Sequence, residues 1–118
     1  MEKIVEQGIL YDFYGELLTG HQRQIYEDAV YHDLSLSEIA EANGISRQGV
    51  HDLLKRCDRT LAEYENKLHL VEKFACIKQK VEEIEKLAGQ DGKNVGPEDG
   101  RRALRQAGRL AREILEEL

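Results

Sequence analysis

A run of polar and basic residues between positions 46 and 56 has the spacing of a helix face. Arg47 can bind guanine through O6 and N7, and Gln48 can bind adenine through N6 and N7. Ser46, with the free amides at a helix start, can bind one phosphate, and Lys55 and Arg56 can reach others. This pattern predicts a nucleic-acid-binding surface. Its members are Ser46, Arg47, Gln48, His51, Lys55 and Arg56.

The same residues also suit a solvated helix face that never touches nucleic acid. Asp52 lies on the neighbouring surface, where its carboxylate repels phosphates. The chain carries a net charge of −6 at pH 7, and residues 1–60 hold 6 Lys or Arg against 11 Asp or Glu. Because non-specific affinity rests on neutralised phosphates, we expect any binding to be modest and sensitive to salt.

Residues 35–54 supply the elements that must position this surface. Ile39 and Ala40 share one face of a short helix, and Gly44 suits the left-handed turn that ends it. Ser46 can cap a second helix. The inward face of that second helix is Val50, Leu53 and Leu54. The segment therefore predicts a helix-turn-helix, whose second helix can enter a DNA major groove.

Helical patterns continue on both sides of this motif. An apolar periodicity over residues 3–18 predicts a first helix. Thr19 with Gln22, and Ser35 with Glu38, have the form of capping boxes, which place the starts of the next two helices. No strand pattern is present, so the sequence predicts an all-α fold.

The C-terminal half predicts a helical hairpin. The pattern from residue 47 has a joint near residues 57–60, after which apolar residues at steps of three and four predict one long helix to about Ala88. Residues 89–96 form a loop, and Pro97 suits the first position of a last helix. The inward face of the last helix is Leu104, Ala107, Ala111, Ile114 or Leu115, and Leu118. We expect it to fold back on the long helix as an antiparallel hairpin.

These elements predict a helix-turn-helix bundle over residues 1–59 and a hairpin extension over residues 60–118, which we expect to form one compact structural unit. The long helix, at roughly 40 Å, is too long for the bundle alone to bury, and the last helix would leave residues 61–68 uncovered. Its surplus length would pack on the bundle or on a second copy of the chain. A homodimer is therefore one expected partner arrangement.

A second basic surface follows the last helix. Four arginines recur there at intervals of four, four and three, and they are Arg101, Arg105, Arg109 and Arg112. Such a ridge could dock on RNA phosphates or on an acidic partner. The commoner use of such a ridge is pairing with glutamates of a neighbouring helix, here the long one. The candidate glutamates are Glu65, Glu72, Glu82, Glu83 and Glu85.

Nothing in the sequence indicates an enzyme. No nucleophile has a partner base, and residues 89–96 lack the strand and the Lys-Ser/Thr ending of a phosphate-binding loop. Cys57, Cys76 and the scattered histidines show no metal-ligand spacing, so we expect no metal and no cofactor. The absence of a signal-peptide layout and of a membrane-length apolar stretch predicts a cytoplasmic protein without membrane insertion.

Two segments flank the helix-turn-helix: LYDFYGELLT at residues 10–19 and YENKLHLVEKF at residues 64–74. With the motif between them they closely resemble the bacterial YlxM family, over roughly the first two thirds of the chain. The resemblance implies a DNA-binding fold like region 4 of sigma factors and a link to the signal recognition particle pathway. That link rests on genes lying beside the gene of the particle's GTPase. Residues beyond Gln79 match no pattern of the family.

The second helix departs from the family at two positions. Relatives commonly begin it Ser-Arg-Gln-Ala-Val-Tyr-Asp, whereas Gly49 and His51 occupy the fourth and sixth positions here. Gly49 weakens the helix by about 1 kcal/mol relative to Ala, and His51 replaces an aromatic that could pack or stack. Both changes bear on base reading and leave the fold intact.

Two functions follow from these residues and from the resemblance. One is a non-enzymatic regulatory or accessory protein that binds duplex DNA or the RNA of the signal recognition particle. The other is an adaptor that binds a protein, such as the particle's GTPase, through the arginine ridge and the first helix. A third hypothesis, a sigma-like transcription factor, is less favoured. Nothing else in the sequence resembles a domain that binds core polymerase or recognises the promoter −10 element.

Overall fold

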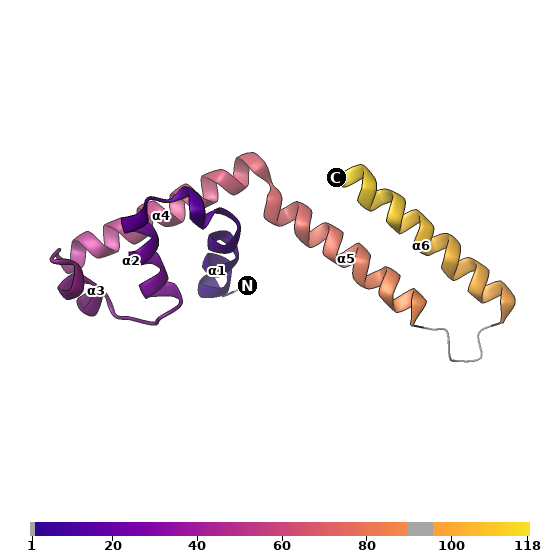
Figure 1. Ribbon diagram of the computed structural model, residues 1–118, viewed down its shortest axis with the longest axis horizontal. Helices are drawn as coiled ribbons and strands as arrows, with labels where there is room; N and C mark the ends of the chain where they lie inside the picture. Colours follow the sequence, from indigo (N-terminus) through magenta and orange to yellow (C-terminus); the bar gives the residue numbers. More distant parts are fainter. Residues whose placement is uncertain (1, 90–95) are drawn as a thin grey trace. The chain divides into compact units, whose positions relative to one another are not determined.

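The computed structural model describes residues 2–89 and 96–118. Over these residues the chain forms six α-helices, one 3-10 turn (Gly15–Leu17) and no strand, which confirms the all-α prediction (Figure 1). The helices are α1 (Lys3–Tyr14), α2 (Gly20–Val30), α3 (Leu36–Asn43), α4 (Arg47–Leu68), α5 (Leu70–Ala88) and α6 (Pro97–Glu117). None of them, within the described residues, combines the length and the apolar character that a bilayer crossing requires.

By its internal contacts the chain divides into two compact units, Met1–Val71 and Glu72–Leu118. The first holds the helix-turn-helix, and the second holds a pair of helices. The domain boundary expected between residues 59 and 60 remains a prediction.

Two capping boxes start α2 and α3. The Thr19 hydroxyl accepts a bond from the Gln22 amide at 3.2 Å, and the Gln22 side chain accepts one from the Thr19 amide at 3.0 Å. Ser35 and Glu38 make the same reciprocal pair, with both distances 3.1 Å. Each pair satisfies two amides that a helix start would leave open. Both predicted caps are confirmed.

The core of the first unit consists of two adjoining clusters that share α4. One holds Tyr14, Leu18, Tyr26, Cys57 and Leu61, and the other holds Ile25, Ile39, Ala40 and Val50. The predicted inward residues of the helix-turn-helix are confirmed, since Leu53 and Leu54 pack against the same clusters. Because α4 contributes to both clusters, it fixes the positions of α1, α2 and α3 together.

The joint expected near residues 57–60 is wrong, and α4 continues to Leu68. Cys57 and Leu61 are both fully buried, so the apolar face passes through this segment without interruption. The break comes at His69, which adopts a left-handed conformation with φ of 55°. The single long helix predicted to Ala88 is therefore two helices.

The end of α4 is held by contacts that reach across the first unit. The Tyr14 hydroxyl donates to Glu65 Oε1 at 2.5 Å and accepts from the Leu70 amide at 3.1 Å. Glu65 Oε1 also accepts from the Val71 amide at 3.0 Å. These bonds satisfy two amides at the start of α5, and they favour a new helix start at Leu70.

Replacing Tyr14 with Phe should lower the free energy of unfolding by about 1–2 kcal/mol, because it removes two hydrogen bonds from a site that is almost wholly buried. Urea titration followed by circular dichroism measures the change. Tyr31→Phe is the matched control, since the Tyr31 hydroxyl bonds Asp12 and the Gly8 carbonyl at the surface. An equal loss in both variants would contradict a special role for Tyr14.

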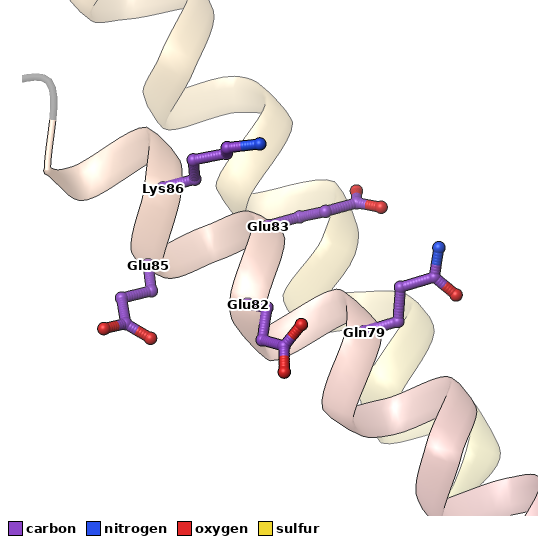
Figure 2. A pocket seen from close by; sticks show the side chains of 5 residues that line it. All are labelled: Gln79, Glu82, Glu83, Glu85 and Lys86. Atoms are coloured by element: carbon purple, nitrogen blue, oxygen red, sulfur yellow. The ribbon is translucent and has the colours of Figure 1, made fainter.

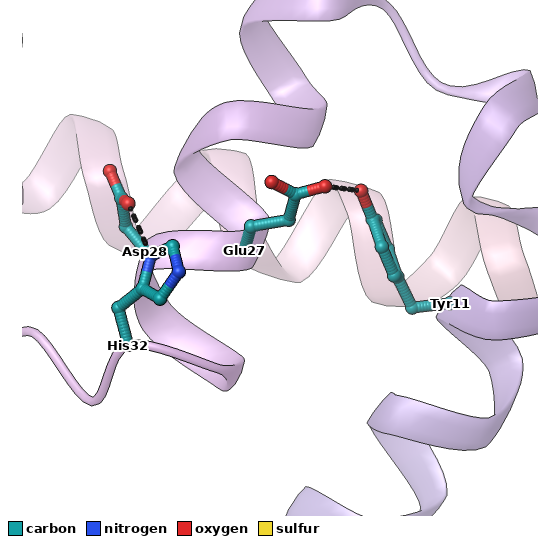
Figure 3. Close-up of polar contacts among 4 residues, drawn as sticks. All are labelled: Tyr11, Glu27, Asp28 and His32. Atoms are coloured by element: carbon teal, nitrogen blue, oxygen red, sulfur yellow. Dashed lines mark hydrogen bonds and ion pairs between the residues drawn. The ribbon is translucent and has the colours of Figure 1, made fainter.

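Other tyrosine hydroxyls also donate hydrogen bonds to carboxylates. The Tyr11 hydroxyl donates a hydrogen bond to Glu27 (Figure 3). The same view shows a separate contact at the end of α2, in which His32 Nδ1 lies 3.0 Å from Asp28 Oδ1. Tyr26, fully buried, donates to Asp58 at 2.6 Å. Each phenol thus buries its ring while its polar end stays bonded.

Alkaline pH should destabilise the first unit. Four tyrosines of the first unit have a pKa raised above 10.0, and burial is the largest cause in each case. They are Tyr11, Tyr14, Tyr26 and Tyr31, and the pKa of Tyr31 is raised to about 12. A folded-state pKa above the unfolded value gives stability that is complete below pH 10 and is lost as the pH rises through the folded pKa. Thermal melts from about pH 8 to about pH 12 should show Tm falling above about pH 10. Tyrosinate absorbance should rise together with unfolding; tyrosines that ionise near pH 10 in the folded chain would contradict this.

In the second unit α5 and α6 run antiparallel, which confirms the hairpin (Figure 1). Lys80 Nζ lies 3.6 Å from Glu113 and 3.7 Å from Glu117. The Cys76 thiol donates to Glu117 Oε1 at 3.4 Å, so the start of α5 meets the end of α6.

The face that α6 turns toward α5 differs in part from the predicted one. The more covered apolar residues are Ala103, Ala107, Leu110 and Ile114, and Leu110 alone among them is buried. Ala107 is covered as predicted, and of the two alternatives Ile114 and Leu115 it is Ile114 that is covered. Leu104, Ala111 and Leu118 were predicted inward but are exposed. The apolar residues of α6 span almost half of its circumference, so their spacing fitted two faces equally well.

Candidate nucleic-acid interface

The turn between α3 and α4 is closed by Gly44. Its φ is 65°, and a Cβ built on it would meet nothing within 4 Å, so conformation and not space favours glycine here. The Ile45 amide bonds the Ala40 carbonyl at 3.2 Å, which ends α3. Ile39 and Val50, both fully buried, then lock the two helices together. The start of α4 is thereby held rigidly against α3.

Ser46 caps α4 as predicted, because its Oγ accepts from the Gly49 amide at 2.9 Å. That bond uses a lone pair, so the hydroxyl proton remains available to donate to a phosphate. The helix dipole adds positive potential at the same end. This end of α4 can therefore attract an anion.

Three of the predicted contact residues line one shallow surface depression. They are Arg47, Gln48 and His51, and Leu36 at the start of α3 completes the lining. Arg47 and Gln48 are exposed, and His51 is partly covered. The structure thus brings together side chains from the first turns of both motif helices.

Lys55 and Arg56 lie further along α4 and are exposed. At about 100° per residue, Lys55 stays on the side of Gln48, whereas Arg56 is turned away from the depression. Arg59 is exposed four residues after Lys55 and extends the same side. Arg59 was not among the residues predicted from the sequence, although its spacing of four from Lys55 indicates the same side of the helix.

Asp52 alters the polar pattern of this surface. Its Oδ1 accepts a hydrogen bond from Gln48 Nε2 at 2.9 Å and lies 3.7 Å from His51 Nδ1. Gln48 must release this bond before both ends of its amide can read a base. The repulsion by Asp52 was expected, but its hold on Gln48 was not.

Asp52→Asn should strengthen nucleic-acid binding about three- to tenfold at low salt, since it removes a negative charge from the surface that would face phosphates. Fluorescence anisotropy with a labelled duplex measures the affinity. Glu63→Gln is the matched control, because Glu63 lies about 16 Å further along α4, beyond the screening length of about 10 Å at 0.1 M salt. A gain of equal size in the control would point to net charge alone.

Comparison with known proteins places the chain in a family. A family model described as "Putative helix-turn-helix protein, YlxM / p13 like" matches residues 1–95. A UPF0122 protein of Caldanaerobacter subterraneus is 53% identical over 76 residues, which cover 64% of this chain and 65% of the relative. A UPF0122 protein of Clostridium novyi is 42% identical over 98 residues, which cover 80% of this chain and 85% of the relative.

The matched residues include the whole helix-turn-helix and the contacts of Tyr14 with the end of α4. The match to the Caldanaerobacter protein spans slightly less than two thirds of that relative's length. The resemblance inferred from residues 10–19 and 64–74 is confirmed, and the family model extends it to residue 95, beyond the first two thirds of the chain that the sequence led us to expect. The chain belongs to the UPF0122 family of YlxM/p13-like helix-turn-helix proteins.

Proposed function

We propose that this chain is a non-enzymatic accessory protein that binds nucleic acid through its helix-turn-helix. The observation that carries the proposal is the depression lined by Arg47, Gln48 and His51 beside the capped start of α4. Side chains that can read bases and a helix end that can attract a phosphate lie together there, as major-groove or loop recognition requires. Lys55 and Arg59 extend the positive surface along α4.

The YlxM resemblance directs this proposal toward the signal recognition particle. Its RNA offers phosphates and splayed loop bases, and such bases can be read by a short basic helix end. Duplex DNA is the other nucleic-acid ligand that the motif suits. We expect cytoplasmic action, as the sequence predicts.

A protein-binding adaptor is the second candidate function, favoured by two observations. The chain is acidic overall, with a net charge of −6, and the Gln48 amide is already bonded to Asp52. In this case the GTPase of the particle is the expected partner, and the arginine ridge of α6 carries the contact. The four ridge arginines are exposed and make no ion pair among the described residues, so the pairing with glutamates of the long helix that the sequence favoured is wrong there.

Fluorescence anisotropy separates the two candidates. The full chain is titrated against labelled signal recognition particle RNA and against random duplex DNA, at low and at near-physiological salt. Binding that weakens as salt rises supports nucleic-acid recognition, and the stronger ligand identifies RNA or DNA. Absence of binding to either ligand at low salt would reject it, and binding to the purified GTPase would then support the adaptor.

A further inference from the structure

The hairpin unit leaves an apolar surface open on one side. In α6, Leu104, Leu115 and Leu118 are 75%, 70% and 82% exposed. Gly108 and Ala111 lie between them, at successive steps of four, three, four and three residues, and are also exposed. These five residues form the open stripe. An aligned apolar stripe of this kind marks a surface that another element covers.

Helix α5 adds to the same side of the hairpin. Val81 is 48% exposed and lies about 90° around α5 from the residues that face α6. The open stripe lies about 100° around α6 from its own contact residues, in the same rotational sense. Because the helices are antiparallel, equal turns in one sense lead to the same side. Val81 and the open stripe thus form one open face.

Gly108 is not required by any contact among the described residues. A Cβ built on it would meet nothing within 4 Å, yet a glycine inside a helix costs about 1 kcal/mol relative to alanine. On an open face such a residue allows the backbone of another helix to approach closely. Among the described residues after Val71 only Leu110 is buried, so this small unit has little core of its own.

The outer edges of the two helices carry complementary charges. Lys80 lies level with Glu113, which sets the register of the pair. In that register three residues of α5 lie at the same height as three residues of α6, to within one helical turn. The pairs are Lys78 with Glu116, Glu82 with Arg112, and Glu85 with Arg105. Figure 2 shows Glu82 and Glu85 extending from α5 without pointing at α6. Within one chain these two edges point in opposite directions and cannot pair.

We propose that a second copy of this chain covers the open face, with α6 of each copy packed on α5 of the other. A two-fold axis parallel to the helices produces this arrangement and completes a four-helix bundle. It brings the outer edge of α5 in each copy beside the outer edge of α6 in the other, twice per dimer. Residues of opposite charge then face each other: Lys78 with Glu116, Glu82 with Arg112, and Glu85 with Arg105. The alternative with α6 on α6 needs an axis across the helices and brings the edges with Arg105 and Arg112 of the two copies together, so charge selects the first arrangement. The proposal does not depend on nucleic-acid binding.

Analytical ultracentrifugation of the full chain tests the dimer. We expect a species of twice the 13.5 kDa chain mass. Leu104→Gln with Leu115→Gln should abolish it while the helical content stays unchanged, since both side chains are exposed in the single chain. Arg112→Glu and Glu82→Arg should each weaken the dimer by about tenfold or more, and their combination should restore it. Arg102→Glu, on the opposite face of α6, is the control and should have no effect.

Three results would overturn the proposal. The first is a monomer at every soluble concentration. The second is a dimer that survives the paired Leu→Gln changes, which would place the contact elsewhere. The third is failure of Glu82→Arg to rescue Arg112→Glu, which would reject the arrangement of the helices. A monomer that sediments with vesicles of anionic lipid would instead assign the open face to a membrane surface.

Discussion

Ile39→Ala should lower the free energy of unfolding by about 2–4 kcal/mol, a large part of the stability of a domain this small. Ile39 is fully buried among α2, α3 and α4, where it packs with Ile25 and Val50. Removing three carbon atoms there loses transfer free energy and leaves a cavity that these helices cannot close without moving. Urea denaturation followed by circular dichroism gives the change.

The matched control is Ile4→Ala, which makes the same chemical change at a position that is 48% exposed in α1. We expect it to cost less than about 1 kcal/mol. Nucleic-acid affinity should also fall in the Ile39 variant at temperatures near its Tm, because the start of α4 is held in place by α3. A small loss of stability at Ile39 would mean that the packing of α3 is looser than the structure describes.

Local chemistry made the first half of the fold predictable. Thr19 and Ser35 each have their capping partner three residues later, and Gly44 supplies the positive φ that the turn demands. Each of these signals lies within five residues of the feature that it sets. The buried residues of α3 followed from the same short-range spacing. The helix-turn-helix could therefore be placed from sequence alone.

The end of α4 could not be predicted in this way. His69 is not a typical helix stop, and one of the two bonds at the start of α5 comes from Tyr14, more than fifty positions away. The inward face of α6 was mispredicted for a related reason. Its apolar residues exceed what α5 can cover, and their burial together with the contacts of Lys80 and Cys76 shows which of them face inward.

The candidate site was predictable as a set of residues but not as a set of bonds. Arg47, Gln48 and His51 followed from helix periodicity, and they do line one depression. The hydrogen bond from Gln48 to Asp52 joins residues four apart on an exposed face. Spacing allows that pair, but equally allows Gln48 to point into solvent. Only the conformation of the side chains decides between the two.

The combined change Arg47→Glu and Lys55→Glu should weaken nucleic-acid binding by about 100-fold at low salt. It removes two cations from one side of α4 and replaces them with carboxylates that repel phosphates. Both side chains are exposed, so the fold should persist, with Tm shifted by only a few degrees. The dependence of log K on log salt should also flatten, since fewer counterions are released on binding.

The control is Lys86→Glu with Arg102→Glu, which makes the same change in net charge on exposed residues of the second unit. If the helix-turn-helix is the binding surface, this control should lose no more than about threefold, through long-range repulsion alone. Equal losses in both variants would show that binding follows net charge and not the surface of α4. If neither variant changes binding, the ligand must contact another part of the chain. A partner protein that binds both variants as well as the unchanged chain would support the adaptor function.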